Sequence, residues 1–285
     1  MDPQKRRARL KRLARWLGTL GTLYFMLRWF EHSQVYHPFR KLEAAPAELG
    51  RAFEEVRFQT SDGVALHGWF FPASTNWPRV QLAFLICHGN AGNVSHRLGL
   101  CGALLETGTS VFVFDYRGYG RSEGRPGEEG TYRDAQAAHG WLRQKGFRGE
   151  NIIAYGESLG GGVVSELALR ETLGGVVLQS TFTSLPEIGA ELFPWLPVRW
   201  ISTIQYDTLA KLPKIRVPVL ILHSRTDELA SFHHGERNFS AANQPKFFCE
   251  LRGGHNEGVW LQTEFQDAVD NFVKLLEQRA PGVEK

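Results

Sequence analysis

The chain has 285 residues, of which 42% are hydrophobic and 22% charged, a composition typical of a globular protein rather than of a disordered or fibrous one. Its formal net charge of +3 is concentrated in the basic N-terminal residues, and the remainder of the chain is close to neutral or slightly acidic. Because the sequence has neither a basic surface pattern nor the signature of an RNA- or DNA-binding module, we exclude a nucleic acid as its partner.

After the basic run, the stretch from Trp16 to Phe30 is apolar on every face, unlike the amphipathic helix of a soluble protein. Its charge-free part is about 12 residues long, shorter than the roughly 20 that span a bilayer. Arg15 and Arg28 could still extend to the two interfaces, where aromatic side chains are also favoured. We therefore expect residues 1–32 to form an uncleaved membrane-anchor helix. An interfacial helix and a helix packed on the domain are the alternatives.

A membrane anchor of this kind also predicts a topology. By the positive-inside rule the basic N-terminus stays in the cytoplasm, as in a single-pass membrane protein. A linker over residues 33–50 then leads to a domain over residues 51–285, which we expect on the far side of the membrane.

The pattern after residue 50 predicts a sheet. Two alternating stretches, 53–59 and 64–71, are joined by Ser61-Asp62-Gly63 and favour an antiparallel hairpin. Short runs that are apolar at every position follow, separated by segments of helical length, which indicates parallel strands buried on both faces. The sequence predicts a mostly parallel, eight-stranded α/β sheet with helices on both faces. The runs are 82–86, 111–114, 151–154, 176–178, 219–222 and 247–251, with a last helix over 264–276.

Three cysteines, Cys87, Cys101 and Cys249, are too few and too widely spaced for a disulfide framework or a CxxC zinc site. We expect them in the core. A structural pair stays possible if the domain is exported.

Ligand sites in open α/β sheets lie beyond the carboxyl ends of the strands. In this chain, five polar residues follow the predicted strands: His88, Asp115, Ser158, Asp227 and His255. We therefore look for the chemistry of the protein among these residues.

The segment Gly156-Glu157-Ser158-Leu159-Gly160 lies between an apolar run and a helical stretch. This is the G-x-S-x-G pattern of a nucleophile elbow in its strand-turn-helix setting. The glycines leave room for a strained turn that exposes the serine hydroxyl. The pattern predicts Ser158 as a nucleophile.

A serine hydroxyl is a weak nucleophile until a base accepts its proton and an acid orients that base. Asp227 and His255 follow Ser158 in the chain order that the elbow requires. We predict Asp227 as the acid and His255 as the base, with Glu228 as the reserve acid. The alternative makes Asp227 a loop cap and His255 a surface residue.

The reaction also needs N–H donors for the oxyanion that forms on the substrate. The segment 88–92, His-Gly-Asn-Ala-Gly, can bring its backbone close to a substrate because of its glycines. We assign the oxyanion hole to the backbone N–H groups of Asn90 and Leu159. For His88 a structural role is favoured over that of a second base.

Other candidates have weaker patterns. There is no Walker A lysine, so a nucleotide site has no support. We expect Asp115 to hold its own loop, and His233 and His234, which with His223 could suggest zinc, to be solvated. The sequence therefore predicts no metal and no organic cofactor.

Four motifs together resemble the membrane-anchored α/β-hydrolase domain proteins, over roughly residues 30–275. They occupy residues 88–92, 115–122, 155–160 and 253–256. The resemblance implies an α/β-hydrolase fold. Similar domains include carboxylesterases, acyl-protein thioesterases, lysophospholipases and prolyl-oligopeptidase-like peptidases. Where the family commonly has Asp-Glu-Ile-Val-Pro, this chain has Asp-Glu-Leu-Ala-Ser at 227–231, which could present the acid more loosely.

An insertion over residues 181–216 occupies the position that covers the active site in this fold. Its aromatic and apolar residues predict either an acyl-binding rim or a short helix packed on the body. The rim residues are Phe193, Trp195, Leu196 and Trp200.

These patterns predict a serine hydrolase that cleaves carboxylic ester or thioester bonds through an acyl-enzyme. The acyl substrate could belong to a lipid or an acylated protein, since an anchor would hold the site beside a membrane. A serine amidase or peptidase and a catalytically idle, membrane-tethered module are the alternatives.

Overall fold

The computed structural model describes residues 3–74, 79 and 81–279. The chain divides into two compact units, Met1–His37 and Pro38–Lys285. Residues 1–2 and 280–285, the outer ends of the two expected segments 1–32 and 51–285, lie outside the described residues.

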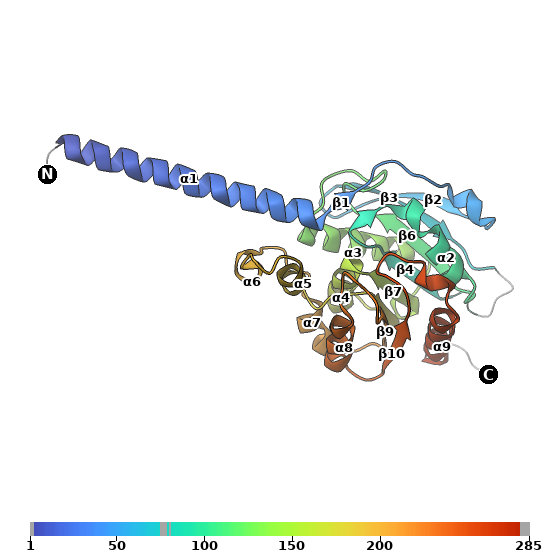
Figure 1. Ribbon diagram of the computed structural model, residues 1–285. Coiled ribbons are helices and arrows are strands. Elements are labelled where there is room, and N and C mark those ends of the chain that lie inside the picture. Colours follow the sequence, from blue (N-terminus) through green and yellow to red (C-terminus); the bar gives the residue numbers. More distant parts are fainter. Residues whose placement is uncertain (1–2, 75–78, 80, 280–285) are drawn as a thin grey trace. The chain divides into compact units, whose positions relative to one another are not determined.

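The first unit contains one helix, α1 (Pro3–Val35), drawn in dark blue in Figure 1. The helix continues to Val35, beyond the boundary at residue 32 that was expected from the sequence. Within it the hydroxyls of Thr19 and Thr22 donate to backbone carbonyls four residues earlier. Among the helices of the described residues, α1 included, none has an 18-residue stretch of the low charge and high hydropathy that crossing a membrane requires. The anchor therefore stays a prediction.

The second unit is built on an eight-stranded sheet in the order β10-β9-β8-β7-β4-β6-β3-β2. Strands β2 and β3 form the expected antiparallel hairpin, β3 is also antiparallel to β6, and the other neighbours are parallel. The predicted fold class is confirmed. The strands are β2 (Glu54–Gln59), β3 (Ala65–Phe71), β4 (Ala83–Cys87), β6 (Ser110–Asp115), β7 (Ile152–Glu157), β8 (Gly175–Gln179), β9 (Val219–Ser224) and β10 (Lys246–Leu251). Two-residue strands, β1 (His37–Pro38) and β5 (Ala91–Gly92), lie outside this sheet.

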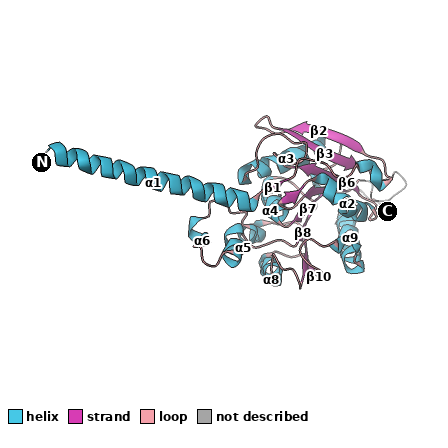
Figure 2. Cartoon of the chain, turned by 45° about the horizontal axis from the view of Figure 1, so that its top comes forward, coloured by secondary structure: helices cyan, strands magenta, loops and turns pink. Residues whose placement is uncertain are grey.

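Helices cover both faces of the sheet, which explains why the central strands are apolar at every position (Figure 2). On one face α2 (Leu98–Leu105) and α9 (Thr263–Arg279) share a core with alternate residues of the strands. On the other face the ring of Phe112 packs against Trp141 of α3, with centroids 4.6 Å apart. The helices of this second face are α3 (Glu128–Gln144), α4 (Leu159–Arg170), α7 (Thr208–Lys211) and α8 (Phe232–Ala241).

The expected insertion over residues 181–216 is mostly helical. It contains α5 (Leu185–Leu192), α6 (Val198–Ile201), α7 and the short helix η4 (Leu212–Lys214). The Ser184 hydroxyl caps α5 by accepting the N–H of Glu187. The remaining short helices are η1 (Pro46–Leu49), η2 (Val94–Arg97), η3 (Gly149–Asn151) and η5 (Val259–Leu261).

All three cysteines are free thiols. Cys87 and Cys101 are buried, as expected, and burial raises the pKa of both thiols. Cys249 is only half-buried, because its strand β10 is the outermost of the sheet.

Candidate active site

Ser158 stands at a sharp turn between β7 and α4. Its φ is 51° and its ψ is −113°, a strained backbone conformation for a residue other than glycine. Its N–H donates to the carbonyl of Gln179 on β8, 2.8 Å away, which holds the turn in place. The flanking glycines are required here: a Cβ at Gly160 would overlap the carbonyl oxygen of Cys87, and one at Gly156 would lie 2.6 Å from the carbonyl oxygen of Gly160. The elbow predicted from the sequence is therefore formed.

The three residues predicted as the triad lie together at the carboxyl ends of β7, β9 and β10. The Nε2 of His255 is 3.0 Å from the Oγ of Ser158. The Nδ1 of His255 is 2.8 Å and 3.0 Å from the two carboxylate oxygens of Asp227. All three side chains are buried or nearly so, which strengthens their electrostatic interactions. The geometry is that of a nucleophile, a base and an acid that orients the base.

The loop after β9 holds Asp227 firmly. Its Oδ1 accepts the N–H groups of Leu229 and Ala230 at 3.0 Å and 2.8 Å. Burial works to raise the pKa of Asp227, but His255 and these two N–H groups outweigh it, so the pKa lies below its ordinary value. His223 donates to the carbonyl of Ala230 at 2.7 Å. The unusual residues at 229–231 therefore do not loosen the acid.

Glu228, the reserve acid, does not take the place of Asp227. Its Oε2 accepts the backbone N–H of His255 at 2.9 Å, so it holds the main chain of the base rather than its ring. This contact also lowers the pKa of Glu228. A carboxylate that binds only the backbone cannot orient the imidazole.

The predicted oxyanion loop follows β4 and is held by two tyrosines of the loop after the neighbouring strand β6. The hydroxyl of Tyr116 donates to the carbonyl of His88 at 3.0 Å, and that of Tyr119 to the carbonyl of Asn90 at 2.7 Å. In the described part of the chain, the backbone N–H groups of Asn90 and Leu159 donate no hydrogen bond. The sequence analysis missed both tyrosines, although they lie in the glycine-rich motif that it singled out at 115–122.

Asp115 was expected to hold its own loop. In the structure it also contacts other segments of the chain. Its Oδ1 accepts the N–H of Val94 at 2.9 Å, and its carboxylate lies 3.5 Å from the Nδ1 of His67 and 3.8 Å from the Nε2 of His88. A Cβ at Gly120 would overlap the same carboxylate, so only glycine fits there. Asp115 thus joins its own loop to β3 and to the segment after the oxyanion loop.

His88 has the structural role favoured by the sequence. It is fully buried, and its Nδ1 donates to the carbonyl of Gly89 at 2.7 Å. Burial, and then the charge of Arg97, lower its pKa to about 4. The ring is therefore neutral near pH 7.

Glu191, His233 and His234 form a cluster whose ligand-type atoms lie within 4.8 Å of one another. His234 is fully buried, which contradicts the expectation that these histidines are solvated; the packing of α8 against the insertion covers it. Its Nδ1 accepts the backbone N–H of Thr183 at 3.2 Å, so the proton of the neutral ring is on Nε2, 3.3 Å from Glu191. A protonated nitrogen cannot bind a metal. His223, the third residue that could have suggested zinc, is fully buried and binds the carbonyl of Ala230 in the loop that holds Asp227.

The residues predicted as a substrate rim lie in the insertion. The exposed fractions of Trp195 and Trp200 are 73% and 91%, and the rings of Phe193 and Trp195 meet edge to face. Leu196 and Trp200 line a surface pocket of about 220 Å³ whose lining includes none of the triad residues. The rim therefore stays a prediction.

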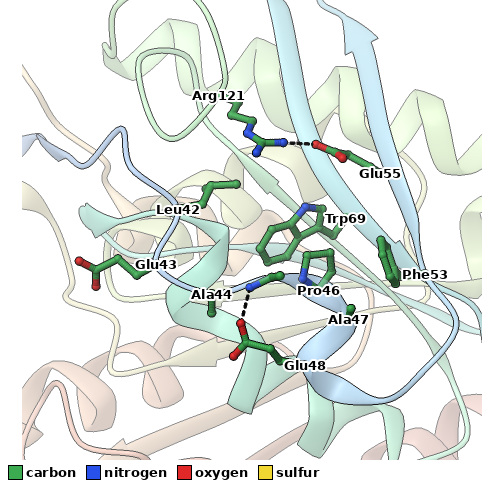
Figure 3. Close-up of a pocket in the computed structure, with 11 residues that line it drawn as sticks. Leu42, Glu43, Ala44, Pro46, Ala47, Glu48, Phe53, Glu55, Trp69 and Arg121 are labelled. Atoms are coloured by element: carbon green, nitrogen blue, oxygen red, sulfur yellow. Dashed lines mark hydrogen bonds and ion pairs between the residues drawn. The ribbon is translucent and has the colours of Figure 1, made fainter.

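A larger pocket of about 410 Å³ lies beside η1 and β3, also without a triad residue in its lining. Figure 3 shows Trp69 and Phe53 beside it, and Arg121 bound to the carboxylate of Glu55. The carboxylate of Glu48 accepts the N–H of Ala45. Because these acidic groups are already bound within the protein, the pocket does not point to a cationic ligand.

Comparisons with known proteins agree with this fold. Residues 83–203 match the family model described as alpha/beta hydrolase fold. The uncharacterized protein Rv2307c of Mycobacterium tuberculosis is 37% identical, over 84% of this chain and 85% of its own length. The alpha/beta hydrolase domain-containing protein WAV2 of Arabidopsis thaliana is 30% identical, over 81% and 83%. Among solved structures, the Pyrococcus furiosus esterase Pf2001 matches with a TM-score of 0.68 and 20% identity, over 87% of this chain and 99% of that one.

Proposed function

The chain belongs to the α/β-hydrolase family, and we propose that it is a serine hydrolase that cleaves ester or thioester bonds of acyl substrates. The observation that carries the proposal is the contact of His255 with both Ser158 and Asp227, at 3.0 Å and 2.8 Å. The resemblance in fold to an esterase is consistent with an ester substrate.

In the first half of the proposed reaction, the Oγ of Ser158 attacks the acyl carbonyl carbon while the Nε2 of His255 accepts the hydroxyl proton. The carbonyl π electrons move to oxygen, and the N–H groups of Asn90 and Leu159 bind the resulting oxyanion. The carbonyl then re-forms, the bond to the leaving oxygen or sulfur breaks, and His255 donates its proton to that atom. Asp227 stabilises the imidazolium throughout.

In the second half, water replaces the leaving group. His255 removes a proton from the water as its oxygen attacks the acyl-enzyme, and the same two N–H groups bind the second oxyanion. The ester bond to Ser158 breaks, and His255 returns the proton to Oγ. The carboxylic acid leaves, and the triad is restored.

Labelling by a fluorophosphonate tests this proposal, since the probe reacts only with an activated serine. We expect labelling of the wild type and none of Ser158→Ala. Ser165→Ala is a matched control, because Ser165 is a buried serine of the adjacent α4 whose hydroxyl donates to the Gly161 carbonyl and not to the triad. A folded wild type that takes up no label at Ser158 would refute the proposal.

Substrate class is tested with esters, thioesters and amides of matched acyl chains. We expect turnover of the ester and thioester series well above that of the amides. Preference for the amides would instead favour the amidase or peptidase alternative.

Membrane attachment through residues 1–32 is a separate proposal. Its support is the basic N-terminus followed by the apolar, aromatic-flanked stretch from Leu13 to Phe30. We expect the full chain to resist extraction from membranes by alkaline carbonate, and deletion of residues 1–37 to release it. Protease digestion of intact vesicles then reports on which side the catalytic unit lies.

A further inference from the structure

A second carboxylate, that of Glu157, lies beside the nucleophile and is not part of the triad. Arg97 binds it through two parallel hydrogen bonds, from Nε at 2.9 Å and from Nη2 at 3.0 Å. Both side chains are largely buried, with exposed fractions of 12% for Arg97 and 22% for Glu157. A bidentate pair of this kind has both strength and a defined orientation.

The pair joins the two halves of the proposed site. Glu157 is the last residue of β7, directly before Ser158, whereas Arg97 ends η2, just after the oxyanion loop. The start of η2 is fixed in turn, because the side chain of Asn93 binds the N–H of Ser95 and the carbonyls of Phe39 and Lys41. Arg97 is therefore held at its backbone and at its guanidinium.

The oxyanion loop lies directly against this pair. A Cβ at Gly89 would be 3.4 Å from both the Nη2 of Arg97 and the Oε1 of Glu157. A Cβ at Gly92 would be only 2.7 Å from the Nη1 of Arg97. The pair thus supports the backbone on both sides of Asn90, whose N–H is a proposed oxyanion donor.

The ionised state of Glu157 depends on Arg97. Burial works to raise the pKa of Glu157, but Arg97 outweighs it and keeps the carboxylate ionised, and both His88 and His255 are near enough to contribute. Without Arg97, burial would favour the protonated carboxyl of Glu157, and the bidentate contact would be lost.

We propose that Arg97 and Glu157 are a positioning pair of the active site. The pair fixes the N–H of Asn90 relative to the Oγ of Ser158 by joining the segment after the oxyanion loop to the residue directly before the nucleophile. This inference rests on the proposed serine hydrolase function.

Steady-state kinetics with p-nitrophenyl butyrate test the proposal. In Arg97→Met we expect kcat to fall about tenfold or more at little changed KM, because oxyanion donors act in the transition state. In Arg97→Met/Glu157→Gln we expect kcat to fall no further than in Arg97→Met, because the bidentate contact is already lost in the single variant.

Arg79→Met is the matched control. Arg79 has the same exposed fraction, 12%, and also binds two carboxylates, those of Asp270 and Glu277, but it lies outside the site. We expect wild-type kinetics from this variant. Thermal unfolding of each variant measures the general loss of stability.

The outcomes separate this inference from the proposed function. A wild type without Ser158-dependent turnover overturns both. An active wild type together with a folded Arg97→Met of unchanged kcat overturns only the inference. If Arg97→Met does not fold, Arg97→Lys and Glu157→Gln, which nearly keep the side-chain volumes, carry the test: a kcat lowered at least about threefold supports the positioning role, and wild-type values overturn it.

Discussion

The Nε2 of His255 lies 3.0 Å from the Oγ of Ser158, although 97 residues separate the two along the chain. Three loops at one edge of the sheet produce this contact: the elbow after β7, the acid loop after β9 and the loop after β10. Each loop has its own hydrogen bonds, so the contact can be tested one loop at a time.

The first prediction concerns the loop after β9 and compares its neighbouring acids, Asp227 and Glu228. Asp227→Asn should lower kcat by about 10³- to 10⁴-fold, because an amide favours the wrong tautomer of His255. Glu228→Gln should lower it less than about tenfold, because Glu228 binds only the backbone N–H of His255. Steady-state kinetics on a short-chain ester measure both. Equal losses would mean that the two acids share the role.

The oxyanion loop makes the second prediction. Tyr119→Phe removes the hydroxyl that donates to the carbonyl of Asn90 at 2.7 Å. We expect kcat to fall about tenfold with KM nearly unchanged, because the Asn90 N–H would be less well oriented in the transition state. Tyr132→Phe, whose hydroxyl binds Glu128 instead, is the control. A rise in KM alone would contradict this role of Tyr119.

The elbow makes the third prediction, on stability. Gly160→Ala should lower the free energy of unfolding by about 3 kcal/mol, because its Cβ would overlap the backbone carbonyl of Cys87. Gly140→Ala, within α3, should instead raise it by about 0.5 to 1 kcal/mol, since no atom lies within 4 Å of the added Cβ. Urea denaturation measures both. A neutral Gly160→Ala would show that the elbow can shift.

Burial of His88 makes the fourth prediction, on pH. Its pKa is lowered to about 4 from an ordinary value of 6.5, so between these values the unfolded chain binds a proton that the folded chain does not. Its contribution to stability is therefore present above pH 6.5 and is lost as the pH falls toward 4. In His88→Asn the fall in unfolding free energy from pH 7.5 to 5 should be smaller by about 2 kcal/mol. Urea denaturation at the two pH values gives the difference, and identical pH dependence in both proteins would refute it.

The proposed substrate rim makes the fifth prediction. If Trp195 and Trp200 bind acyl chains, the double alanine variant should lose about tenfold in kcat/KM on decanoyl esters and little on acetyl esters, because longer chains bury more apolar surface. Leu261→Ala, which removes an exposed apolar side chain outside the insertion, is the control. The same loss on both chain lengths would favour the alternative, a short helix packed on the body.

Much of the fold could be predicted because its signals are local. Strands that are buried on both faces must be apolar at every position, so β4, β6, β7, β8 and β9 are visible as continuous runs. The signal of the elbow is also local, because its strained turn needs glycines on both sides of Ser158. Asp227 and His255 followed from one further rule, that functional residues come after parallel strands.

The remaining features depended on which chain segments the fold brings together. Sequence analysis could not assign Tyr119 and Arg97 to the oxyanion loop, because their partners lie 29 and 60 residues away. It predicted Asp227 as the acid with Glu228 as the reserve, but it could not show that Glu228 binds the backbone N–H of His255. It also expected a solvated His234 that packing buries. The sequence by itself determined the strands and the strained turn at Ser158, because local sterics and burial decide them. Only the tertiary structure decided what surrounds Ser158, because the order of strands in the sheet brings those distant groups together.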